Sequence, residues 1–542
     1  MNSVLLPAAM LIPVIFALAV AFMPAEKARG TALLGMLLGA VPVLGLLFLF
    51  DYQDAAAFQF AGAVDWIPEF GLRLSLGIDS VALLLIALTA LLGPVCVLGS
   101  WTAIADRQRL FYAWLLILQT AMIGVFAARD LVVFYICFEF TLLPMFILIG
   151  VFGSTNRKIA SIKFFLYTFT GSLIALAGLV YVAWYAAGHY GHWTLDIGEL
   201  ALAARTMSPT QQGWVLAAML AGFAVKVPLF PLHTWLPLAH TEAPTAGSVI
   251  LAGVLLKLGT YGIYRFVLGY VPLAVAEHAP LLAVLSIIGI VYAGLICWVQ
   301  TDVKKLVAYS SVSHLGFCVL GLVAVNATGL SGSVLYMLNH GLSTGALFLM
   351  IGFMYERYHT RDMGQLGGLA SKMPVWSSFM VFFVLASVGL PGLNGFVSEF
   401  LCLIGAFQSS SSMVAAGEPG ATPGALGPWY GFFAGTGMVV AAMYLLIMVG
   451  KVVWGELVEP HEHHHGGESH SHLPADLTAR EITALVPLAL GCLVFGLWPQ
   501  PLLGAIEAPV NVAIQSFEFQ APAPAPPHEH AQADAHVGEV AP

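Results

Sequence analysis

Long apolar stretches recur along almost the whole chain, and short polar stretches separate them. A helix needs about 20 consecutive apolar residues to cross the hydrocarbon layer of a bilayer. Stretches of that length predict about 14 membrane-spanning helices between residues 3 and 503. The pattern therefore predicts an all-α polytopic membrane protein.

Two of the predicted spans contain residues that interrupt a helix. Pro228 and Pro231, which lack a backbone donor, follow Lys226 in the first of them. The stretch Pro391–Gly395 precedes Glu399 in the second. Irregular backbone at membrane depth is tolerated only where it is buried in protein or lines a cavity. We therefore expect broken helices near Lys226 and near Pro391–Gly395, each beside a charged side chain.

The two interruptions also suggest how the chain is organised, because broken spans at corresponding places of two halves are typical of inverted repeats. An alternating stretch from Phe70 to Leu76 further predicts a short hairpin in a long outer connection. The expected parts are an N-terminal three-helix segment (1–109), a first inverted five-helix repeat (110–269), a second inverted five-helix repeat (279–455), a His-rich cytoplasmic loop (456–480), a last transmembrane helix (481–503) and a Pro/Ala/His-rich outer tail (504–542).

Composition agrees with a membrane protein and excludes several other classes. Hydrophobic residues make up 59% of the chain and charged residues only 9%, against roughly 25% charged residues in soluble domains. The 20 Lys and Arg residues are outnumbered by 29 Asp and Glu, so no basic surface is expected to bind nucleic acid. The six cysteines lie in apolar stretches without CxxC spacing, which argues against an iron–sulfur cluster, a zinc site or a disulfide framework.

Basic residues indicate the orientation of the chain. Most of the 20 Lys and Arg residues fall in alternate connections between the predicted spans. Because Lys and Arg accumulate in cytoplasmic loops, we expect a multi-pass protein of the bacterial cytoplasmic (inner) membrane with both termini on the outer side. The histidines at 461–472 and the segment 520–542 are expected to be solvated, and a flexible His-rich tract lacks the fixed geometry of a metal site.

Four charged residues fall near the middle of predicted spans, namely Glu139, Lys226, Lys257 and Glu399. Each costs roughly 2.5–3.5 kcal/mol at the centre of a bilayer, so such residues indicate an ion or proton path by default. If Glu139 pairs with Lys226, movement of the carboxylate changes the proton affinity of the lysine, and the pair acts as a proton valve. The alternative is a purely structural membrane subunit in which two Glu and two Lys form static ion pairs.

Histidines near the same depth favour a proton relay, because imidazole gains and loses a proton near neutral pH. Lys226, His233 and His240 recur every seven residues, which places them near one helical face if the helix continues. His314 and His340 lie within spans of the second half. The sequence contains neither a recognisable redox site nor a nucleotide-binding motif, so we expect a partner or an ion gradient to supply the energy.

Four blocks of sequence resemble a known family: CFEFTLLPMFILIG, AGFAVKVPLFPLHTWLPLAHTEAPTAGSVILAGVLLKLGTYGIYRF, QTDVKKLVAYSSVSHLGF and LNHGLSTGALFLMIGFMYERYHTRD. Over roughly residues 75–455 the chain resembles the antiporter-like subunits of respiratory complex I and of multisubunit cation/proton antiporters. Within this family Glu399 favours the branch of subunit M of NADH:quinone oxidoreductase (chain 4 in mitochondria), because the sister subunits usually have a lysine there.

The resemblance implies a proton-translocating membrane subunit of a proton-pumping NADH:quinone oxidoreductase. It implies that flavin, iron–sulfur clusters and the quinone acceptor site belong to partner subunits, and that no cofactor or metal is held by this chain. Its other membrane partners would include sister antiporter-like subunits. The alternative is a subunit of a multisubunit Na⁺/H⁺ antiporter, although clustered carboxylates suited to sodium are missing from the predicted spans. The implied proton-transfer residues are Glu139, Lys226, Lys257, His314, His340 and Glu399, with His233 and His240 as a secondary relay.

Overall fold

The computed structural model describes residues 4–460 and 474–518, and helices dominate this part of the chain. Twelve helices among the described residues are long and apolar enough to cross a membrane, which confirms the all-α polytopic class. Most of them are continuous: α1 (Leu5–Phe22), α2 (Ala25–Leu49), α3 (Ser80–Gly99), α4 (Gln108–Ala127), α7 (Arg157–Tyr190), α14 (Pro272–Trp298), α15 (Val303–Val323), α16 (Ala327–Tyr358), α20 (Pro428–Val452) and α21 (Ala479–Leu497).

Two spanning helices are locally irregular. The span at residues 131–152 consists of α5 (Leu131–Phe140) and α6 (Leu142–Phe152), which meet at Thr141. The span at residues 245–270 contains two π-helical turns, in which hydrogen bonds skip one more residue than in an α-helix. Its parts are α11 (Thr245–Ile250), the π-turn η4 (Leu251–Leu255), α12 (Leu256–Gly262), the π-turn η5 (Ile263–Val267) and α13 (Leu268–Tyr270).

Both predicted helix interruptions are present. The first separates α9 (Pro209–Lys226) from α10 (Leu236–Glu242), and the second separates α17 (Pro374–Val388) from α18 (Asn394–Gln408). None of these four helices is counted among the twelve candidate spans of the described chain. The total of fourteen crossings and the arrangement as inverted repeats stay predictions.

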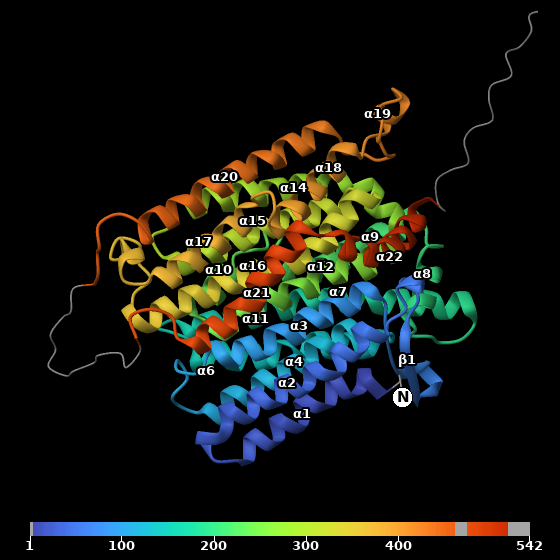
Figure 1. Ribbon diagram of the computed structural model, residues 1–542. Helices are drawn as coiled ribbons and strands as arrows, with labels where there is room; N and C mark the ends of the chain where they lie inside the picture. Colours follow the sequence, from blue (N-terminus) through green and yellow to red (C-terminus); the bar gives the residue numbers. More distant parts are fainter. Residues whose placement is uncertain (1–3, 461–473, 519–542) are drawn as a thin grey trace, which may run out of the picture.

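The helices form a bundle in which the irregular elements lie near the centre (Figure 1). The most apolar windows of α16 and of the π-bulged span are buried throughout, whereas α1 and α21 are mostly exposed on the outside of the bundle. In Figure 1, α1 and α2 lie along one edge and α20 along the opposite edge, with α15, α16 and α12 between them. An exposed apolar face is expected where lipid or another membrane subunit replaces water.

Shorter elements gather at one end of the bundle (Figure 1). They include an antiparallel hairpin, which is longer than the alternating stretch predicted, with Gly62 opposite Leu76 and Asp65 opposite Arg73. The strands of this hairpin are β1 (Gln59–Ile67) and β2 (Leu72–Ile78), and the 3-10 turns η2 (Tyr52–Asp54) and η3 (Pro68–Phe70) adjoin them in sequence. The helices at this end are α8 (Ile197–Ala204), α19 (Ser411–Ala415) and α22 (Gln500–Glu518) (Figure 1). A third 3-10 turn, η6 (Leu369–Ser371), lies elsewhere, beside the C-terminal end of α20, where Ala370 donates to the carbonyl of Val453.

The C-terminal region differs from the sequence expectation. The part 504–518 of the expected tail belongs to α22, whose residues Ile506 and Val510 are buried against the bundle. The hydroxyl of Tyr264 donates to the carbonyl of Pro509, 3.1 Å away, which attaches this helix to the π-bulged span. The Pro, Ala and His residues near the end of the chain favoured the prediction of a tail from residue 504 onward. The amphipathic pattern of residues 504–518 was therefore not recognised. The predictions for 461–472 and 520–542 lie outside the described residues.

Candidate functional site

The first helix interruption places Lys226 at the end of α9 inside the bundle. Pro228 and Pro231 remove the donors that would continue the helix. The indole of Trp235 donates to the carbonyl of Val225 at 2.9 Å, which satisfies one of the acceptors left open at the helix end. The amine of Lys226, only 4% exposed, donates to the carbonyl of Phe138 at 3.1 Å.

The environment of this amine is aromatic. Its nitrogen lies 3.3 Å from the centroid of the Phe138 ring, a cation–π contact that stabilises the charged form where water is excluded. Phe138 packs against Phe134 and Phe223, with ring centroids 5.4 and 5.8 Å away. Lys226 is therefore held by one carbonyl and one ring within an apolar wall.

Glu139 lies next to this lysine but does not form an ion pair with it in the described structure. Its carboxylate is buried at both oxygens, and besides Lys226 the Ser172 side chain interacts with it. The two charges still interact electrostatically. The structure therefore places the two charged groups near each other without an ion pair, and their action as a proton valve stays a prediction.

The prediction that Lys226, His233 and His240 share one helical face is wrong. It assumed a continuous helix, whereas residues 227–235 are not helical. His233 packs against the ring of Phe230, with centroids 5.7 Å apart. His240 lies in α10 and stacks on Phe348 at 4.6 Å. The two prolines break the periodicity, so a spacing of seven carries no geometric meaning across this segment.

Lys257 lies between the two π-turns and is fully buried. Its amine lies 2.7 Å from Nδ1 of His340 and also donates to the carbonyl of Ala252. That carbonyl belongs to the first π-turn, five residues before the lysine. The irregular helix thus supplies a backbone acceptor beside the amine, which fits the frequent occurrence of π-turns at functional sites.

Glu399 is held by two aromatic side chains of the second half. Nδ1 of His314 lies 3.1 Å from its Oε1, and the hydroxyl of Tyr336 donates to the same oxygen. The Tyr336 oxygen is also 2.7 Å from Nδ1 of His314. The rings of His314 and His340 have centroids 5.9 Å apart. Lys257, His340, His314, Tyr336 and Glu399 therefore form one buried series, which we call the central series.

The alternative of two static Glu–Lys ion pairs is not what the structure contains. In the described residues, neither Lys226 nor Lys257 forms an ion pair, and Glu399 pairs with His314 instead. Of the six predicted proton-transfer residues, four belong to the central series. The other two, Glu139 and Lys226, lie apart from this series, near the first interruption, and are not ion-paired in the described structure.

Sequence analysis missed Tyr336 and Asn394, the partner of Asn339 at the second interruption. Tyr336 lies four residues before His340 in α16, and this spacing on one helical face was a usable signal. Asn339, also in α16, donates to the carbonyl of Asn394 at 2.7 Å, and Asn394 donates back to the carbonyl of Asn339 at 3.2 Å. These bonds hold the start of α18 against α16 and so position Glu399 one turn further on.

Comparison with known proteins identifies the family. The sequence model described as "NADH:quinone oxidoreductase/Mrp antiporter, TM" matches residues 128–418. NADH-ubiquinone oxidoreductase chain 4 of Arabidopsis thaliana is 38% identical, and the alignment covers 94% of this chain and 97% of the relative. NADH-quinone oxidoreductase subunit M of Rhodobacter capsulatus is also 38% identical, with 88% of each chain covered.

Solved structures agree with this assignment. A chain in the structure of respiratory complex I from Thermus thermophilus with bound NADH superposes with a TM-score of 0.81 at 28% identity. The match covers 95% of this chain and 100% of the other. The relatives named subunit M and chain 4 agree with the branch that Glu399 predicts. The chain therefore belongs to the NADH:quinone oxidoreductase/Mrp antiporter family, within the branch of antiporter-like membrane subunits of respiratory complex I.

Proposed function

We propose that this chain moves protons across the membrane through the central series, driven by redox chemistry in partner subunits of complex I. The observation that carries the proposal is the series of buried titratable groups from Lys257 to Glu399, in which only the step between His340 and His314 lacks a direct hydrogen bond. Lys257 contacts His340 at 2.7 Å, and His314 contacts Glu399 at 3.1 Å. Burial of four titratable side chains in one place is costly unless they serve a polar path.

The step between the two histidines is short enough for a relay. Their ring centroids are 5.9 Å apart, and Nε2 of each ring has no partner among the described residues. One bridging water can join nitrogens at such a separation. A proton on the Lys257 amine can then pass to His340, on to His314 and finally to the Glu399 carboxylate.

The pair Glu139 and Lys226 acts as the control element in this proposal. The backbone at Gly259, two residues after Lys257, lies against the end of α9, so close that a Cβ there would be 2.8 Å from the Val227 nitrogen. A change of charge at Lys226 therefore acts on the helix that carries Lys257. In this proposal, movement of Glu139 toward or away from Lys226 shifts the end of α9, and the contact at Gly259 passes that shift to the helix that carries Lys257 and so controls proton release toward His340.

The proposal also includes the membrane in which the chain resides and the subunits that surround it. It resides in the bacterial cytoplasmic membrane with both termini on the outer side, as the basic residues indicate. Its neighbours are sister antiporter-like subunits and other membrane subunits of the complex. Flavin, iron–sulfur clusters and the quinone site are carried by partners, so that this chain contributes proton transfer and no redox step.

The test uses the assembled complex in inside-out membrane vesicles, with NADH-driven acidification measured beside NADH oxidation. Two variants at Lys257 distinguish a requirement for proton release by this residue from a requirement for a fixed positive charge. Lys257→Met removes the amine at similar length, and Lys257→Arg keeps a charge that is not released near neutral pH. Both are expected to lower acidification by at least about ten-fold, since removing a proton-transfer group typically costs 10²–10⁴-fold.

The matched control is Lys451→Met, which changes an exposed lysine of α20 and should leave acidification unchanged. Normal pumping in Lys257→Met would overturn the relay, and normal pumping in Lys257→Arg alone would show that only a fixed charge is needed. Sodium-dependent proton movement without NADH would instead favour the antiporter alternative.

A further inference from the structure

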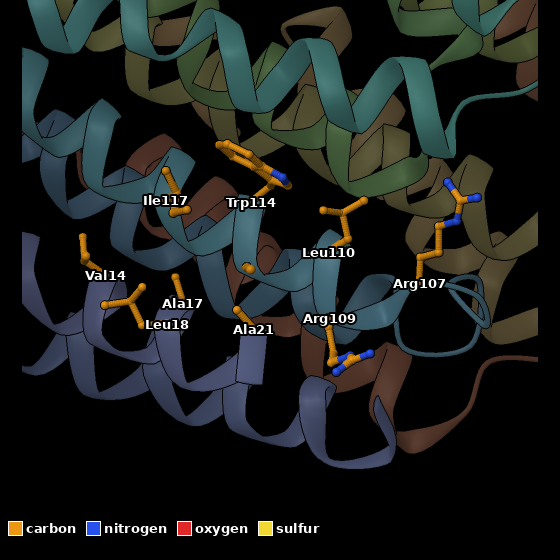
Figure 2. A pocket seen from close by; sticks show the side chains of 10 residues that line it. Val14, Ala17, Leu18, Ala21, Arg107, Arg109, Leu110, Trp114 and Ile117 are labelled. Atoms are coloured by element: carbon orange, nitrogen blue, oxygen red, sulfur yellow. The ribbon is translucent and has the colours of Figure 1, made fainter. Parts of the chain in front are cut away.

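A groove on the surface of the bundle is not used by the proton path. It lies between α1 and α4 and has a volume of about 480 Å³ (Figure 2). Its apolar wall includes Val14, Leu18 and Ala21 from α1 and Leu110, Trp114 and Ile117 from α4. Two basic residues, Arg107 and Arg109, stand at one end of it, where α1 ends and α4 begins.

The two arginines are available to a ligand. Both side chains are exposed, and in the described part of the chain neither guanidinium forms a hydrogen bond, an ion pair or a cation–π contact. Arg29, near the same end of the bundle, differs because its guanidinium donates to the carbonyl of Trp101 and covers that indole ring. Asp106 precedes the pair in sequence and makes no ion pair with either arginine in the described structure.

The backbone adds to this positive end. Arg107 is the residue before α4 and has a left-handed conformation, with φ at 50°, and no side chain caps the helix. The first amide groups of a helix lack intrahelical partners and, with the helix dipole, favour an anion. This effect supplements the two guanidinium groups, which can each donate two hydrogen bonds to phosphate oxygens.

We propose that this groove binds one phospholipid with an anionic headgroup, with its phosphate at the end of the groove where Arg107 and Arg109 lie. The wall from Ala21 to Val14 rises two helical turns, or about 10 Å, into the membrane, which suits the first part of an acyl chain. Trp114 lies beside the wall, and Figure 2 shows its indole nitrogen on the side toward the arginines. Indole rings favour the level of lipid headgroups for this combination of apolar body and polar edge.

Charge and shape together select this occupant. A free anion would satisfy the arginines and leave the apolar wall uncovered, whereas a helix of another subunit would cover the wall and would need acidic side chains at one end to neutralise the two charges. An anionic phospholipid does both, and the volume is within the range of about 300–1,000 Å³ found for small-molecule sites.

The test compares lipids of equal chain length on the intact purified complex. Palmitoyl-oleoyl phosphatidylglycerol and palmitoyl-oleoyl phosphatidylcholine are added after delipidation, and lipid bound to this subunit is counted by native mass spectrometry. The wild type should retain one phosphatidylglycerol in preference to phosphatidylcholine. The double variant Arg107→Gln/Arg109→Gln should lower this preference by about 30-fold, as expected for two cationic residues at an interface.

Two further variants make the test specific. Ala21→Phe fills the groove without changing charge and should abolish the retained lipid. Lys27→Gln/Lys158→Gln removes two exposed charges from the first turns of α2 and α7 and should change nothing. Equal retention in the arginine variant, displacement of the lipid by millimolar phosphate, or cross-linking of a photoreactive group at position 18 to a protein instead of a lipid would each overturn the proposal.

Discussion

At the scale of single residues, Tyr336 connects the basic side chain of His314 with the acidic side chain of Glu399 in the second half of the chain. Its hydroxyl donates to Glu399 and lies 2.7 Å from His314. A hydroxyl can give one proton and accept another in the same event, so it can pass protons between an imidazole and a carboxylate. Its role in the central series follows from these contacts.

We expect Tyr336→Phe to lower NADH-driven acidification by about ten-fold while the complex assembles normally. The substitution keeps the ring, whose edge faces His314 and His340, and removes only the hydroxyl. A hydrogen bond to a charged group is worth about 1.5–3 kcal/mol, so its loss is sufficient for a change of this size. The measurement is acidification of inside-out vesicles per NADH oxidised.

The control for this prediction is Tyr309→Phe in α15. Tyr309 is partly buried, and its hydroxyl forms no hydrogen bond within the described chain. Acidification should therefore stay at the wild-type level. The same loss in both variants would mean that Tyr336 acts through packing and not through its hydroxyl.

The sequence allowed most charged members of the site to be predicted, but not how they are paired. Glu139, Lys226, Lys257 and Glu399 stand out because a charge in an apolar stretch is costly. Tyr336 does not stand out, since a tyrosine in a membrane helix is common. The partners of Lys257 and Glu399 depend on which helices pack together, and periodicity within one helix carries no such information.

At the scale of elements, the second interruption brings the backbone into contact with Glu399. Gly389 ends α17 with φ at 81°, a left-handed conformation suited to glycine. A Cβ at this position would lie 2.8 Å from Oε2 of Glu399. The missing side chain thus leaves room for the carboxylate beside the broken helix.

We expect Gly389→Ala to lower both stability and acidification. The left-handed conformation costs an ordinary residue about 1–2 kcal/mol, and the new methyl group displaces the carboxylate from His314. The measurements are the thermal unfolding midpoint of the purified complex and vesicle acidification.

The matched control is Gly435→Ala in α20, where the added methyl group meets no atom within 4 Å. This change should leave acidification intact, because alanine favours a helix by about 1 kcal/mol over glycine. A Gly389→Ala complex with full acidification would show that the position of the carboxylate beside the break is unimportant.

Sequence reasoning located both broken helices because proline and glycine have direct backbone consequences. It did not locate the π-turns on either side of Lys257. The sequence of these turns, Leu251–Leu255 and Ile263–Val267, is ordinary for a membrane helix. A π-turn arises from how a helix packs on its neighbours, so only the tertiary structure reveals it.

At the scale of the whole molecule, the last spanning helix is attached to the buried centre by an ion pair. Arg357, at the end of α16, donates to Glu481 in α21 at 2.8 and 3.1 Å. The arginine side chain is 4% exposed and the glutamate side chain is not exposed. The same guanidinium donates to the carbonyls of Pro474 and Asp476, so it also fixes the chain that leads into α21.

Loss of one partner from this pair should loosen the attachment of α21. Glu481→Gln leaves the arginine charge buried without compensation, and breaking a buried pair in this way costs about 3–5 kcal/mol. We expect a clear fall in the thermal unfolding midpoint of the complex. Asp65→Asn, which breaks the exposed pair with Arg73, should cost at most about 1 kcal/mol.

The double variant Arg357→Met/Glu481→Leu distinguishes charge from packing. Apolar residues of similar volume can replace a buried ion pair at little cost, so the double variant should recover part of the stability lost in Glu481→Gln. Recovery stays incomplete because Glu481 also accepts from the backbone and hydroxyl of Thr478 and caps its own helix. If the unfolding midpoint falls further in the double variant than in Glu481→Gln, the pair stabilises the fold through its hydrogen bonds more than through compensation of the buried charge.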